Sequence, residues 1–167
     1  MVKTALVVLV LVAAVSIPAE TPTLPATDVT HTDIQAFIHA LPPNAVSDKP
    51  IRVVDAGGYR IGVFGVLRPK SVQQESNLHE TKGSEIYYIL EGSATLVTGG
   101  TIPNAHPMSP GSITMQGARI EGGVTRRVTK GDVVIIPGRT PHWFSAQDGD
   151  LQYLIFRPDP ENRLALK

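Results

Sequence analysis

Two stretches decide the fold of this chain, HETKGSEIYYILEG at residues 79–92 and GDVVIIPGRTPHWF at residues 131–144. Each contains a short apolar run bounded by glycine or proline, which is typical of a buried strand between tight turns. Each also carries a polar residue beside that run, Glu85 in the first and His142 in the second. A buried carboxylate is costly unless it is paired or binds a metal ion, so both residues are candidates for a functional site.

His79 adds a second imidazole to this pair. Two imidazoles and one carboxylate form a donor set that suits Fe(II), Mn(II), Ni(II) or Zn(II). Three protein ligands leave positions on the metal open for water, dioxygen or substrate. The alternative is a polar cluster without metal, in which Glu85 is hydrogen-bonded to a buried histidine.

Two aromatic residues are predicted to line the cavity around this group. Strand alternation places Tyr87 on the same face as Glu85, and Phe144 on the same face as His142. The alternative for both rings is ordinary core packing.

The two stretches resemble the paired motifs of the cupin superfamily. The first motif is a His-x-His pair, three or four residues, Glu, six residues and Gly. Glu85 and Gly92 have the six-residue gap, and His79 falls at the second histidine with one extra residue before Glu85. The second motif is Gly, five residues, Pro-x-Gly, two residues and His, which Gly131, Pro137 and His142 match.

The chain departs from these motifs at three positions. Asn77 stands at the first histidine of the pair, Arg139 at the second-motif glycine, and Ala146 at a distal asparagine. The common site of the family has three histidines and one glutamate, so this chain keeps two of the three imidazoles. Asn77 is a possible further ligand through its carbonyl oxygen, which suits these metals less well than imidazole. A second alignment places His79 in the first histidine slot and Thr81 in the second.

The resemblance covers residues 51–157 and implies an all-β fold, a cupin or jelly-roll-like β-barrel with a short N-terminal helix. We assign the barrel to residues 51–158 and a C-terminal tail to residues 159–167. The runs EIYYIL and DVVIIP are apolar on both parities, which predicts strands covered on both faces. Residues 101–123 are weakly patterned and are predicted to form a long loop with a small hairpin.

Residues 20–50 are predicted to form an extended arm and one short helix. Thr30 and Asp33 resemble a capping pair, and apolar residues recur at helical spacing up to Leu41. Pro42 and Pro43 stop the element, which predicts a helix over residues 31–41.

Residues 1–19 have the layout of a secretory signal peptide. Lys3 precedes an apolar run that is shorter than the roughly 20 residues of a spanning helix. Small residues allow cleavage after Ser16 or after Ala19. We therefore expect an exported protein, periplasmic or extracellular, with no stable membrane insertion after cleavage.

Composition excludes several classes of function. The chain has no cysteine, which excludes disulfides, iron–sulfur clusters and cysteine nucleophiles. It has 15 basic and 15 acidic residues without a basic run, so nucleic acid is not an expected partner. A small-molecule ligand or substrate is the expected partner, together with a possible homodimer by analogy with other cupins.

The resemblance implies a metal-dependent enzyme on a small polar molecule, since the family includes dioxygenases, decarboxylases, isomerases and lyases. A dioxygenase-like activity suits an open metal site. Two alternatives remain open from the sequence, a non-catalytic binding or sensing barrel and a structural or storage oligomer.

Overall fold

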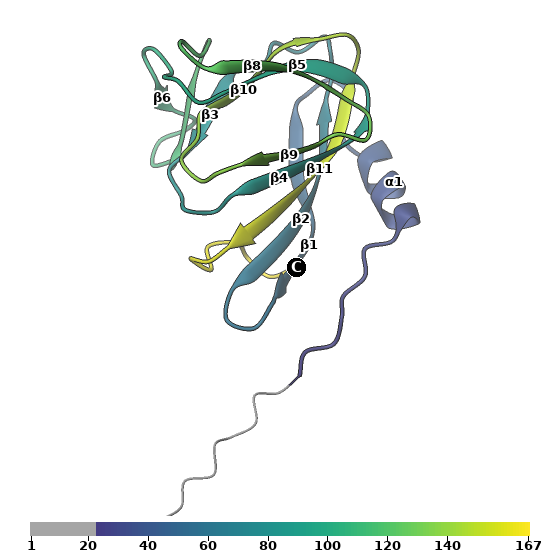
Figure 1. The fold of residues 1–167 in the computed structure, drawn as a ribbon. Helices are drawn as coiled ribbons and strands as arrows, with labels where there is room; N and C mark the ends of the chain where they lie inside the picture. Colours follow the sequence, from purple (N-terminus) through teal and green to yellow (C-terminus); the bar gives the residue numbers. More distant parts are fainter. Residues whose placement is uncertain (1–22) are drawn as a thin grey trace, which may run out of the picture.

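The computed structural model describes residues 23–167, which form two antiparallel sheets facing each other and one short helix outside them (Figure 1). The helix is α1 (His31–His39). The strands are β1 (Ser47–Asp55), β2 (Arg60–Arg68), β3 (Ser76–His79), β4 (Glu85–Glu91), β5 (Ser93–Thr98), β6 (His106–Pro107), β7 (Thr114–Gly117), β8 (Val124–Thr129), β9 (Val133–Ile136), β10 (His142–Gln147) and β11 (Leu151–Asp159).

The two sheets interleave strands from distant parts of the chain. One has the order β1-β2-β11-β4-β9 and the other the order β6-β7-β3-β10-β5-β8. Strands that follow one another in sequence, such as β3 and β4 or β9 and β10, therefore lie in opposite sheets. This arrangement closes an antiparallel barrel and confirms the predicted all-β fold.

The interior is filled by alternate residues of both sheets, as strand periodicity requires. In β4, Tyr87 and Ile89 are buried on the same parity as Glu85. The buried core cluster comprises Phe64, Val66, Tyr87, Ile89, Ala94, Leu96, Val128, Val134, Ile136, Phe144, Leu151, Tyr153 and Ile155.

Helix α1 begins as predicted and ends two residues earlier than predicted. The Thr30 side chain accepts a hydrogen bond from the Asp33 backbone N–H, and the Asp33 side chain accepts one from the Thr30 backbone N–H. These two bonds form a capping box. The helix packs on β2, where a Cβ atom on Gly65 would lie 2.8 Å from the Phe37 ring. Gly65 thus permits the close approach that buries Ile38.

The prediction that the runs EIYYIL and DVVIIP are covered on both faces is wrong. Tyr88 is 40% exposed, Val133 60% and Ile135 67%. β9 is the edge strand of its sheet, and the helix of the described chain packs on β2 instead. The outer face of β4 and β9 is therefore apolar and open.

Residues 101–123 form the predicted long connection with a hairpin. β6 and β7 pair antiparallel, and an isolated bridge joins Thr101 to Glu121. The hairpin sits beside β3 and therefore beside the residues that precede the first motif.

Both ends of the barrel domain extend past their predicted limits. β1 begins at Ser47, before the predicted boundary at residue 51, and the backbone of Lys167 pairs with that of Val53. No helix within residues 23–167 is long and apolar enough to cross a membrane. The predicted signal peptide lies outside the described residues, so export stays a prediction.

The turn between β9 and β10 places the second motif against the first. A Cβ atom on Gly138 would lie 2.6 Å from the carbonyl oxygen of Lys82, so only glycine allows this approach. Arg139, at the position where the family has glycine, adopts a left-handed φ of 60°. The turn thus holds His142 close to the segment that joins His79 to Glu85.

We expect Gly138→Ala to lower the free energy of unfolding by about 2 kcal/mol, because the added methyl group collides with backbone atoms that cannot rotate away. Urea denaturation measures this change. Gly149→Ala is the matched control, since a Cβ atom there meets nothing within 4 Å and its φ is not left-handed. Equal stabilities of the two variants would show that the turn does not depend on this close approach.

Candidate metal centre

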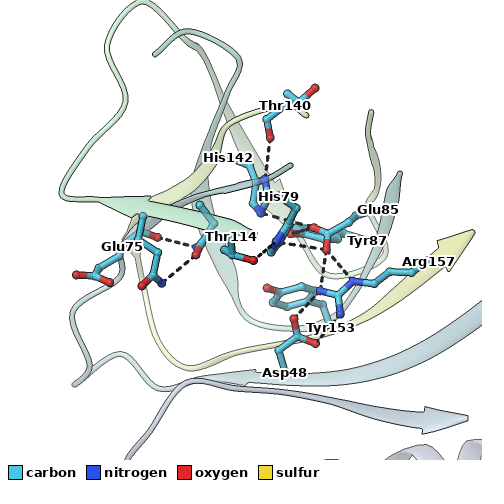
Figure 2. A network of polar contacts seen from close by, with 12 residues as sticks. Asp48, Glu75, His79, Glu85, Tyr87, Thr114, Thr140, His142, Tyr153 and Arg157 are labelled. Atoms are coloured by element: carbon cyan, nitrogen blue, oxygen red, sulfur yellow. Dashed lines mark hydrogen bonds and ion pairs between the residues drawn. The ribbon is translucent and has the colours of Figure 1, made fainter. Parts of the chain in front are cut away.

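The structure brings His79, Glu85 and His142 together inside the barrel (Figure 2). His79 is the last residue of β3, while Glu85 and His142 begin β4 and β10. One ligand atom from each of the three residues lies within 4.8 Å of the other two. The fold therefore places the three side chains close together, as the sequence predicts.

Glu85 is buried and has four polar neighbours. Oε1 accepts from Nε of Arg157 at 2.7 Å, and Oε2 accepts from the Tyr87 hydroxyl at 2.8 Å. Nε2 of His79 is 3.5 Å from Oε1, and Nε2 of His142 is 3.6 Å from Oε2. Burial raises the pKa of Glu85, but Arg157, the two histidines and Tyr87 outweigh it and lower the pKa to about 2. The carboxylate is therefore ionised at neutral pH.

His142 is buried and held in one orientation by its backbone surroundings. Its Nδ1 lies 3.0 Å from the carbonyl oxygen of Thr140, which can only accept, so Nδ1 carries a proton. Burial lowers the pKa of His142 and outweighs the opposite effect of Glu85, which favours the neutral ring. Nε2 of His142 is thereby directed at the Glu85 carboxylate, 3.6 Å from Oε2. An imidazole nitrogen and a carboxylate oxygen directed at one point of a buried site are arranged to hold a cation.

His79 is half-buried and is oriented by Thr114. The Thr114 hydroxyl lies 2.9 Å from Nδ1, which leaves Nε2 directed at Glu85. The rings of His79 and His142 are 5.3 Å apart between centroids. Both imidazoles thus have the outer hydrogen bond that typically fixes a metal-binding histidine.

A void of about 10 Å³ is lined by all three residues and by the turn at residues 136–140. This volume is about the space that one water molecule requires. The donor set and the void together fit one divalent ion, which these three residues could hold. The ion's identity does not follow from the donor set, since Fe, Mn, Ni and Zn all accept imidazole and carboxylate.

Asn77 lies opposite His142 in the register of β3 and β10, but its side chain is engaged elsewhere. Its Oδ1 accepts from Gln116 at 3.0 Å, and its Nδ2 donates to the carbonyl oxygen of Glu75. The predicted fourth ligand is therefore hydrogen-bonded to a neighbouring amide. Thr81, the residue of the second alignment, lines the cavity without a hydrogen bond to the three residues.

The three residues lie at the wall of a cavity of about 880 Å³. Tyr87 lines this cavity, whereas Phe144 is not among its lining residues and has its ring stacked on that of Tyr87, with the centroids 6.1 Å apart. The acidic side chains of the lining are Asp48, Glu75, Glu85 and Asp159. The basic side chains of the lining are Lys49, Arg68, Arg157 and Arg163.

Arg157 and Arg68 were not predicted from the sequence. Arg157 binds both Glu85 and Asp48, and Arg68 lies further along the cavity wall. In β11, Arg157 shares its parity with the buried Tyr153 and Ile155. That alternation was the signal that could have placed Arg157 inside the barrel.

The two motif segments thus enter one antiparallel barrel from opposite sheets, and their polar residues meet in its interior. The chain has a cupin fold. The motif glycine Gly92 supports this assignment, because it has a φ of 85° and leaves no room for a side chain beside the carbonyl of Asp150.

No family model and no curated protein matches the chain. Among solved structures, a double-stranded β-helix protein from Klebsiella pneumoniae is 15% identical with a TM-score of 0.49, over 84% of this chain and 97% of that chain. An RmlC-like cupin from Methanocaldococcus jannaschii is 12% identical with a TM-score of 0.44, over 71% and 84%. The DMSP lyase DddQ from Ruegeria pomeroyi is 17% identical with a TM-score of 0.44, over 90% and 83%. At these identities the likeness is one of fold.

We expect the protein to lose stability as the pH falls from about 4.5 towards about 2. The folded pKa of Glu85 is about 2 and its ordinary value 4.5, so its contribution is complete above 4.5 and is lost on protonation. That contribution corresponds to roughly 3 kcal/mol at neutral pH. Glu85→Gln should therefore flatten the acid limb of the stability curve, measured by urea unfolding between pH 2 and 7 with chelator present.

The exposed Glu80→Gln serves as the control for this measurement and should keep the wild-type acid limb. If Glu85→Gln and Glu80→Gln gave the same curve, the ion pair of Glu85 with Arg157 would not govern acid stability.

Proposed function

We propose that this cupin binds one divalent first-row metal ion through His79, Glu85 and His142 and acts as a metal-dependent enzyme on a small polar molecule. Dioxygenase-like chemistry is the first candidate. The observation that carries the proposal is the convergence of Nε2 of His79, Nε2 of His142 and the Glu85 carboxylate beside an ion-sized void.

The surrounding residues each have a supporting task in this proposal. Thr140 and Thr114 orient the two imidazoles through their outer nitrogens. Arg157 and Tyr87 hold the Glu85 carboxylate in place. When bound, the ion supplies Lewis-acid chemistry and open positions for a ligand. The cavity of about 880 Å³ is of the size that binds small molecules and lies directly beside the three residues.

One observation favours a second candidate, a non-catalytic binding barrel. Arg157 already forms an ion pair with Glu85 at 2.7 Å, so a positive charge neutralises the carboxylate without a metal. In that case the histidines and Glu85 form a closed polar network, and the cavity binds its ligand independently of them.

We expect protein purified without chelator to contain about one first-row metal ion per chain, because each chain has one set of three protein ligands around one void. His142→Ala should lower metal affinity by more than about 100-fold, because losing a direct ligand costs more than the 10- to 100-fold lost with a supporting residue. Elemental analysis and metal titration measure both quantities.

His106→Ala is the matched control, since His106 is exposed and does not line the cavity. Absence of stoichiometric metal in the wild-type protein would contradict the proposed function. The binding barrel would then be supported by ligand-induced thermal shifts that persist unchanged in His79→Ala.

A further inference from the structure

Arg68 is a partly buried cation on the cavity wall, apart from the three candidate metal ligands. It ends β2 on the parity of Phe64 and Val66, whose side chains point into the core. Its Nε donates to the Tyr153 hydroxyl at 2.8 Å, and its Nη1 donates to Oε1 of Gln74 at 2.7 Å. These two bonds fix the plane of the guanidinium group.

The guanidinium of Arg68 has no carboxylate partner among residues 23–167, in contrast to the guanidinium of Arg157. Within the same residues its Nη2 makes no hydrogen bond, and every side-chain nitrogen or oxygen fully removed from solvent has a partner. Nη2 is therefore open to the cavity that Arg68 lines. A fixed guanidinium with free N–H groups facing a cavity is suited to bind an anion.

A short series of contacts connects Arg68 with the candidate metal centre. Arg68 donates to Tyr153, whose ring lies 4.8 Å from the ring of Tyr87, and Tyr87 donates to Glu85. Arg68 and Tyr87 line the same cavity as His79, Glu85 and His142. A ligand held at Arg68 would therefore share this cavity with the three candidate metal ligands.

We infer that the substrate of this site is a small monocarboxylate, whose carboxylate group binds Arg68 while its other end reaches His79, Glu85 and His142. A single carboxylate fits because Arg68 is the one guanidinium of the lining that is shown with a fixed plane and a free Nη2, whereas that of Arg157 is paired with Glu85 and Asp48. The inference names the substrate class of the proposed function. It rests on that proposal for one point, that the substrate reacts at His79, Glu85 and His142.

The test compares butyrate with its uncharged isostere butyramide in NMR titrations of chelator-treated protein, with the Arg68 Nε–H signal as the direct readout. Butyrate should bind at least about tenfold more tightly than butyramide, as a charge-assisted hydrogen bond implies. Arg68→Gln should reduce butyrate affinity to that of butyramide, and Arg68→Lys should restore part of it. Arg119→Gln, whose guanidinium pairs with Glu121 on the surface, is the matched control and should bind as the wild type.

Equal affinities for butyrate and butyramide in the wild type would overturn the inference, as would unchanged butyrate binding in Arg68→Gln. If Arg68→Gln does not fold, the chemical shift of the Arg68 Nε–H signal in the wild type tests the inference by itself. This signal should shift with butyrate and not with butyramide, and an unchanged signal with butyrate would overturn the inference. Butyrate binding at Arg68 in a protein that takes up no metal would refute the proposed function only. Butyrate binding that requires metal and is independent of Arg68 would refute the inference only.

Discussion

An ionised carboxylate inside an apolar barrel is the constraint on which the rest of this structure depends. Moving a carboxylate out of water costs several kcal/mol, and at Glu85 this cost is offset by Arg157, which is itself bound by Asp48. These contacts join β1, β4 and β11 at one point of the barrel. The two histidines approach the same carboxylate from β3 and β10, so both sheets are positioned by one buried charge.

The candidate ligands could be predicted because they lie in two segments of fixed spacing. Glu85 begins an apolar strand and His142 follows a turn bounded by two prolines, so each was recognised as a polar group in an apolar setting. Arg157 and Arg68 were not predicted because Arg68 ends β2 and Arg157 lies two residues before the end of β11, where an arginine is ordinarily solvated. Strand alternation alone places both on the buried parity, and that rule is independent of any motif.

The exposed outer face of β4 and β9 shows what local sequence does not determine. Val133 and Ile135 have the composition of a strand covered on both faces, yet they stand at a sheet edge with their side chains open. Whether a strand is central or at an edge depends on which distant segments pair with it, and the apolar run carries no information about that pairing. The Asn77 side chain is a similar case, because Gln116 reaches it only through the pairing of β3 with β7.

The charge balance of the cavity lining has a thermodynamic consequence. Its acidic and basic side chains are equal in number, so a divalent ion at the three-residue centre would give the cavity an excess of positive charge. Such a field favours an anionic ligand, and linkage between two binding sites is reciprocal. The factor by which the ion strengthens carboxylate binding is then the factor by which the carboxylate strengthens retention of the ion. A protein that bound both in this way would hold the ion most tightly while the anionic ligand is bound, and would release it most readily when the cavity is empty.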